Sequence, residues 1–194
     1  MNHRFLSPPK SVLALFAIIG CDQTSPLAPT AQPAAQPGAV AAAGLKMVPW
    51  KESYAASGTI TPGARCPAPQ LLVSLAGGGT ATHVGKYTIV NSHCVDPTTG
   101  ALTDGTFVKT AANGDRIFGA YTGGSTVIQP PAPIAIFTIT GTINLTGGTG
   151  RFTGATGTAT MNGSLRADFS QPNVPTEVTL VMVGDISSPG STKQ

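Results

Sequence analysis

The sequence predicts an all-β domain, a small antiparallel barrel of about eight strands, preceded by a disordered tether rich in Pro and Ala. Val, Ile, Thr, Phe and Tyr dominate residues 49–188, and their runs end at Gly, Pro, Asn or Asp. Gly and Pro recur at short intervals, and no long segment has the period of an amphipathic helix. In addition, several long segments alternate strictly between apolar and polar side chains.

Eight segments have the composition of strands and are bounded by turn-forming residues. They are Tyr54–Ile60, Gln70–Ala76, Lys86–Val95, Gly105–Thr110, Arg116–Tyr121, Ile134–Leu145, Ala155–Phe169 and Glu177–Ile186.

The alternation is clearest in the last three of these segments. Odd positions of 155–169 are apolar or small, and even positions are polar. Odd positions of 137–145 and even positions of 178–186 form two further faces that are mainly apolar. This period of two predicts antiparallel strands with one side in water. Glycines on the apolar faces favour a closed, curved sheet. We therefore predict a barrel, with a β-sandwich as the alternative.

The N-terminus has the pattern of an export signal. Arg4 and Lys10 precede an apolar run at residues 11–20, which is too short to span a bilayer. The end of the run, Ile18-Ile19-Gly20-Cys21, resembles the lipobox of bacterial lipoproteins, with Ile where Leu is usual. The resemblance implies that Cys21 is lipidated and becomes the new N-terminus. An ordinary secretory signal with an incidental cysteine is the alternative.

These features predict four regions along the chain. Residues 1–20 are the lipoprotein signal peptide, and residues 21–48 are a lipid-anchored linker too rich in Pro and Ala to fold. Residues 49–188 form the barrel, and residues 189–194 form a flexible tail. We expect the protein in the bacterial cell envelope, held to a membrane by its lipid on the periplasmic or outer-surface face.

Charge and motifs exclude several functions. Charged residues make up 10% of the chain. From Trp50 onward the sequence contains eight Lys and Arg and seven Asp and Glu, a net charge of +1. Without a basic stripe, nucleic-acid binding has little support. No nucleophile elbow, HExxH motif or close carboxylate pair is found, so we assign no catalytic residue, metal site or cofactor.

Cys66 and Cys94 remain as an even pair in an exported chain. The oxidising compartment permits a disulfide between them. The alternative is a metal site with His83 and His93, but the spacings match no standard zinc pattern.

The segment GGTGRFTGATG, residues 147–157, first suggests a phosphate-binding loop. Its glycines are spaced G-x-G-x-x-x-G, one residue longer than the dinucleotide fingerprint, and a strand follows instead of a helix. The Gly-Lys-Ser/Thr of a P-loop is also absent. We therefore interpret the segment as a hairpin connection: Gly147 and Gly148 permit a tight turn, Phe152 caps the barrel end and Arg151 faces water.

The same segment resembles the GGTG-[KR]-F-x-x-A-x-G signature of the dirigent and allene oxide cyclase barrel superfamily. The matching residues are Gly147, Gly148, Thr149, Gly150, Arg151, Phe152, Ala155 and Gly157. Residues 79–87, GTATHVGKY, resemble a G-x-A-T-H-x-G motif of secreted bacterial proteins with the same type of domain. The resemblance implies an eight-stranded barrel with an apolar lumen. Plant relatives form oligomers, so it also implies a homo-oligomer as a candidate assembly. Their catalytic residues cannot be placed on this sequence.

Three functions fit these observations. The first is a non-catalytic envelope barrel whose lumen holds a small apolar ligand. The second is an isomerase or cyclase like the plant enzymes, with His83 or Tyr87 as polar lumen residues that contact the ligand. Both share a strand face with Asn91 and His93. The third is a structural surface protein, which would have a filled lumen and a flat, Thr-rich outer face.

Overall fold

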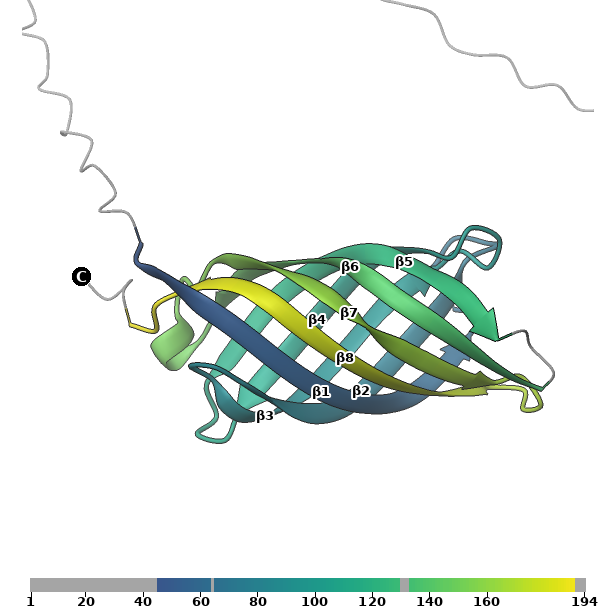
Figure 1. Ribbon diagram of the computed structural model, residues 1–194, viewed down its shortest axis with the longest axis horizontal. Coiled ribbons are helices and arrows are strands. Elements are labelled where there is room, and N and C mark those ends of the chain that lie inside the picture. The colour runs from purple at the N-terminus through teal and green to yellow at the C-terminus, as the bar shows by residue number, and fades with distance from the viewer. Residues whose placement is uncertain (1–44, 64, 130–132, 191–194) are drawn as a thin grey trace, which may run out of the picture. The chain divides into compact units, whose positions relative to one another are not determined.

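A computed structural model describes residues 45–63, 65–129 and 133–190. These residues form a closed barrel in which eight antiparallel strands follow one another in chain order (Figure 1). This confirms the predicted fold class. The strands are β1 (Met47–Thr61), β2 (Leu71–Ala81), β3 (Gly85–Val95), β4 (Ala101–Ala111), β5 (Arg116–Gln129), β6 (Ile134–Gly148), β7 (Gly157–Asp168) and β8 (Val174–Ser187).

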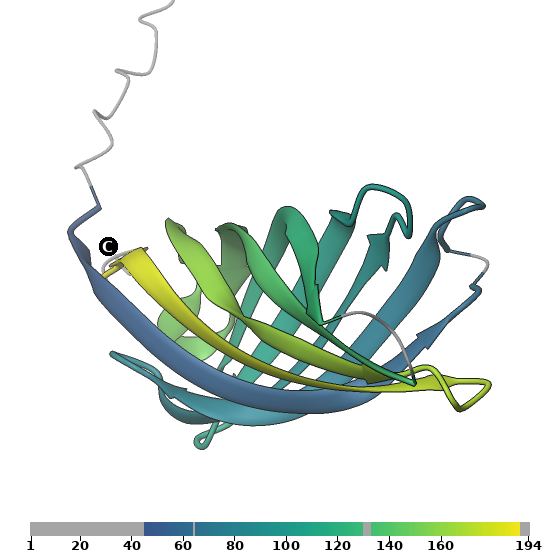
Figure 2. The ribbon, with the colours of Figure 1, turned by 45° about the vertical axis from the view of Figure 1, so that its right-hand side comes forward.

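The barrel closes because β1 pairs with both β2 and β8. The pairing of β1 with β8 runs from Met47 opposite Ser187 to Ile60 opposite Val174. Every strand therefore has two hydrogen-bonded neighbours, and the described sheet has no free edge. The strands cross the barrel obliquely and curve around a common interior (Figure 2), as closure of a small sheet requires. β1 starts two residues before the predicted domain boundary.

The interior follows the predicted alternation. On β7, Ala159, Met161, Leu165 and Ala167 are buried, and the residues between them face outward or are glycine. The apolar positions of β6 and β8 are buried in the same way. Apolar side chains on all eight strands therefore share one core, which lies along the barrel axis.

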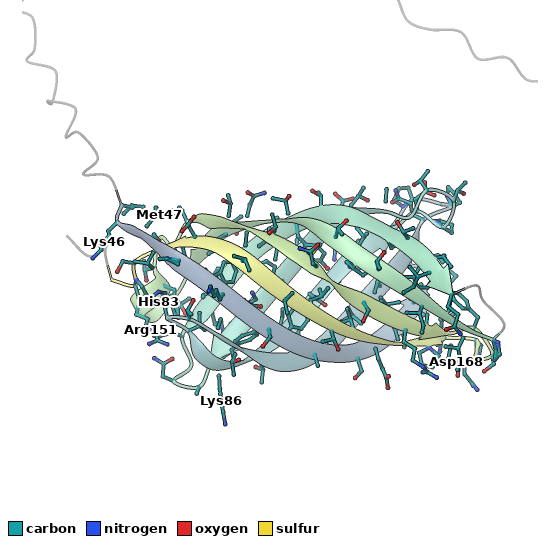
Figure 3. All side chains as sticks on the ribbon, viewed as in Figure 1. Lys46, Met47, His83, Lys86, Arg151 and Asp168 are labelled. Carbon is teal, nitrogen blue, oxygen red and sulfur yellow. A yellow bond between two sulfur atoms is a disulfide. The ribbon has the colours of Figure 1, made fainter. Side chains whose placement is uncertain are left out.

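The two ends of the barrel differ. At one end lie the start of β1, the end of β8, the β2–β3 and β4–β5 turns, and the 3-10 helix η1 (Gly150–Phe152). Figure 3 shows Lys46, Met47, His83 and Arg151 near this end, and Asp168 near the other. We call the first the sealed end and the second the mouth. Within the described ranges, no helix is long and apolar enough to cross a membrane.

Candidate ligand-binding cavity

A cavity of about 600 Å³ opens at the mouth of the barrel. This volume lies within the range of small-molecule sites, roughly 300–1,000 Å³. Its wall is mainly apolar, and its buried members come from six strands. They are Ile60, Val73, Leu102, Ile139 and Leu165, together with His93. The inward positions of the strands thus form the wall near the mouth, where the opposing side chains do not meet.

Loops and strand ends form the rim of the cavity. The β3–β4 loop, residues 96–100, lines one side, and its fold is fixed by Asp96, whose Oδ1 accepts the backbone N–H groups of Thr98 and Thr99. These hydrogen bonds lower the pKa of Asp96, so it is ionised at neutral pH. Val127 and Phe169 also line the rim and are nearly half exposed. An incoming molecule therefore meets apolar side chains before it reaches the interior.

His93 and Tyr121 form a polar pair at the inner part of the cavity. The Tyr121 hydroxyl lies 2.7 Å from Nδ1 of His93, and the rings meet edge to face with centroids 5.5 Å apart. Both side chains are buried, but only His93 lines the cavity. Burial raises the pKa of Tyr121, so its hydroxyl stays protonated. The pair thus places one neutral imidazole at the inner end of an apolar site.

We expect acid to destabilise the barrel through His93. Burial, and then the Arg65 guanidinium, lower the pKa of His93 from 6.5 to about 4. Between these values the unfolded chain binds a proton that the folded chain does not, so this stability is full above pH 6.5 and falls toward pH 4. A change from about pH 7 to about pH 5 should lower the free energy of unfolding by about 2 kcal/mol. Urea denaturation at both pH values measures the loss.

The control for this prediction is His93→Phe, which removes the titrating group. Its loss of stability over the same pH range should be clearly smaller than that of the wild type. An equal loss in both proteins would show that other groups cause the acid sensitivity.

Deeper in the barrel, toward the sealed end, lies a buried ion pair. Nζ of Lys109 is 2.5 Å from Oε2 of Glu52, and both side chains have no exposed surface. Tyr87 donates its hydroxyl to Oε1 of the same carboxylate at 2.5 Å. Burial, and then the Glu52 carboxylate, raise the pKa of Tyr87, which keeps it a donor. Both oxygens of the buried carboxylate therefore have a partner.

Aromatic rings complete the surroundings of the lysine. Nζ of Lys109 lies 4.4 Å from the ring centroid of Trp50 and 4.6 Å from that of Phe107, which are cation–π distances. Burial lowers the pKa of Lys109, and the Glu52 charge opposes that change. None of these groups lines the cavity. The cluster therefore supports the interior of the barrel and is closed to a ligand in the cavity.

The two predicted ligand-contacting residues are separated by the fold. Tyr87 points into the barrel but is engaged with Glu52 and does not line the cavity. His83 lies in the β2–β3 turn, is exposed, and has a positive φ of 65° (Figure 3). The turn ends the alternation that put both residues on one face. His93, which shared that face in the sequence, is the residue that reaches the cavity.

The predicted disulfide is present near the mouth. Cys66, in the β1–β2 connection, is joined to Cys94 of β3, with Cα atoms 5.6 Å apart. This engages both cysteines and replaces the metal-site alternative. Arg65 beside it donates to the Ser92 hydroxyl and to the Asp104 carbonyl, which fastens the same connection to β3 and β4. Cys21 lies outside the described residues.

The GGTG segment closes the sealed end. Gly147 and Gly148 belong to β6, so the tight turn predicted there lies further along the chain, at η1. Gly150 has a φ of +57°, and a Cβ there would collide with the Asp115 carboxylate. That carboxylate accepts the backbone N–H of Arg151 at 3.3 Å. Phe152 is fully buried, as expected of a cap. The motif is thus a plug fastened to the β4–β5 turn.

Arg151 adds a second layer over this plug. Its guanidinium donates to the Val84 carbonyl at 3.0 Å and lies 4.7 Å from the Phe152 ring centroid. The side chain is 41% exposed, so it faces water only in part. These contacts join η1 to the β2–β3 turn, and the barrel is packed shut on this side.

Comparisons with protein-family models, curated proteins and solved structures found no match to the chain. The fold and the cavity therefore rest on the chain's own residues.

Proposed function

We propose that this protein is an envelope lipoprotein whose barrel binds a small apolar molecule in the mouth cavity. The observation that carries the proposal is the shape of the interior. One end is plugged by Phe152 and filled by a buried ion pair, and the other holds about 600 Å³ of space with a mainly apolar wall. Filling this space with an apolar ligand would remove apolar surface from water, which favours binding.

The other two functions have less support. The catalytic alternative relied on His83 or Tyr87, and neither lines the cavity. The structural surface protein would have a filled lumen, whereas this barrel has a cavity at its mouth. We also propose that the domain is a member of the dirigent and allene oxide cyclase superfamily. The barrel fold agrees with that resemblance.

Filling the cavity should abolish binding. Val95 lines the cavity and is half-buried, so Val95→Trp would occupy part of the space. We expect the affinity for diphenylhexatriene, a hydrocarbon probe that fluoresces on leaving water, to fall at least about tenfold. Val183→Trp is the matched control, because Val183 faces solvent on β8. Probe fluorescence titration measures both. Equal binding to both variants, or no binding to the wild type, would refute the proposal.

The envelope location rests on Cys21 and is tested separately. We expect Cys21→Ala to abolish incorporation of labelled palmitate and to move the protein out of the membrane fraction. Ser53→Ala, at an exposed position of β1, is the control and should keep both the label and the membrane association. Membrane association that survives Cys21→Ala would contradict the lipid anchor without bearing on the cavity.

A further inference from the structure

The hydrogen bond between His93 and Tyr121 determines what the cavity offers to a ligand. Nδ1 of His93 and the Tyr121 hydroxyl are 2.7 Å apart, and either can be the donor. Among the described residues, the Tyr121 hydroxyl has no other hydrogen-bond partner. A buried hydroxyl proton without an acceptor is costly. Tyr121 therefore donates to Nδ1, and neutral His93 carries its own proton on Nε2.

Nε2 of His93 is left for a ligand. It forms no hydrogen bond with any described residue, since the only bond of the ring is through Nδ1. In the part of the chain that the structure describes, the fully enclosed side-chain polar atoms without a hydrogen-bond partner are on Trp50, Asn91, Thr103 and Arg151, and Nε2 of His93 is not one of them. A ring nitrogen that is unpartnered but not enclosed faces the space that the ring lines. The inner end of the cavity thus presents one N–H donor.

Charge at the mouth limits the ligand further. Among the described residues that line the cavity, Asp96 is the one ionised at neutral pH, and it lies on the rim. No Lys or Arg is in that lining. A carboxylate ligand would pass a like charge and find no cation among the described lining residues. The Arg65 guanidinium, which acts on His93, is exposed and lies outside that lining. A neutral ligand with an oxygen acceptor is not repelled by Asp96 and needs no cation.

From this geometry we propose that the cavity selects uncharged, mainly apolar molecules that carry one oxygen acceptor, such as a ketone, aldehyde or ester. The acceptor receives the Nε2–H of His93, and the apolar body fills the space toward the mouth. Tyr121 is a positioning residue, since it fixes the tautomer without touching the ligand. The inference rests on the proposed ligand binding and names the substrate class of that same cavity.

The test is displacement of diphenylhexatriene from the full chain carrying Cys21→Ala, so that no attached lipid competes. Decane, methyl octyl ketone and decanoate are the competitors at neutral pH. His93→Phe should lower the ratio of ketone to decane affinity by about three- to tenfold, the effect of one neutral hydrogen bond. Tyr121→Phe should also lower the ratio of ketone to decane affinity. His83→Gln, at an exposed histidine, should leave it unchanged. Decanoate should bind more weakly than the ketone.

A second readout tests the tautomer itself. The full chain has three histidines, and in its nitrogen NMR spectrum the His93 signals are assigned by their loss in His93→Phe. His93 should show a protonated Nε2 and an unprotonated Nδ1. The ketone should shift the Nε2 resonance. A proton on Nδ1, or a ketone-to-decane ratio equal in wild type and His93→Phe, would overturn the inference while probe binding still supports the cavity. Absence of probe binding to the wild type would overturn the proposed function instead.

Discussion

Glu52→Gln is expected to lower the free energy of unfolding by about 3–5 kcal/mol, because it leaves the Lys109 charge buried without its partner. Nζ of Lys109 has no exposed surface and lies 2.5 Å from Glu52, so water cannot replace the lost carboxylate. Trp50 is the single tryptophan and lies 4.4 Å from that nitrogen. Its fluorescence during urea denaturation therefore reports directly on the cluster.

Two further variants identify the cause of the loss. Glu177→Gln removes an exposed carboxylate from β8 and should change stability by less than about 0.5 kcal/mol. Glu52→Gln combined with Lys109→Met removes both charges and should recover much of the loss, since an apolar pair avoids burying charge. If Glu52→Gln cost no more than Glu177→Gln, the ion pair would not be a buried one.

The pH dependence of the Glu52→Gln variant has a definite sign. Burial lowers the pKa of Lys109 from 10.5, and loss of the Glu52 charge removes the effect that opposes it. Between the lowered value and 10.5 the unfolded chain binds a proton that the folded chain does not. The stability of the variant should therefore rise with pH across this range. Denaturation at neutral and alkaline pH measures it.

Removing the disulfide is expected to lower the free energy of unfolding by about 3.5 kcal/mol, an effect similar to that of Glu52→Gln. Cys66 and Cys94 are 28 residues apart, and opening a loop of that length restores that much conformational entropy to the unfolded chain. Cys66→Ala combined with Cys94→Ala, in a Cys21→Ala background, should show the loss in urea denaturation. Reducing the parent protein should give the same shift. An unchanged denaturation midpoint after reduction would contradict the prediction.

The fold was predictable because alternation maps directly onto the two faces of a strand. Met161 and Leu165 are buried where the odd positions of the segment predicted, and Met182 is buried on β8 in the same way. The start of β1 was harder to predict from the sequence. Lys51 and Glu52 look like surface charges in the sequence, so the strand was predicted to begin at Tyr54. The structure shows that it begins at Met47.

The interior charges were missed for the same reason, although the sequence contains a signal for them. Glu52 has the parity of Trp50 and Tyr54, and Lys109 has the parity of Phe107. A charge on an apolar face usually indicates a strand end or a surface, and only the pairing of two distant strands shows that these charges meet. The cavity was not predictable from alternation, because its volume depends on how far the opposing side chains reach across the barrel.

The chain enters and leaves the barrel at the same end, where Met47 pairs with Ser187. Any attachment made upstream of Met47 or after Ser187 therefore holds the domain by its sealed base. A fusion partner, an affinity tag or a solid support joined there leaves the entrance clear.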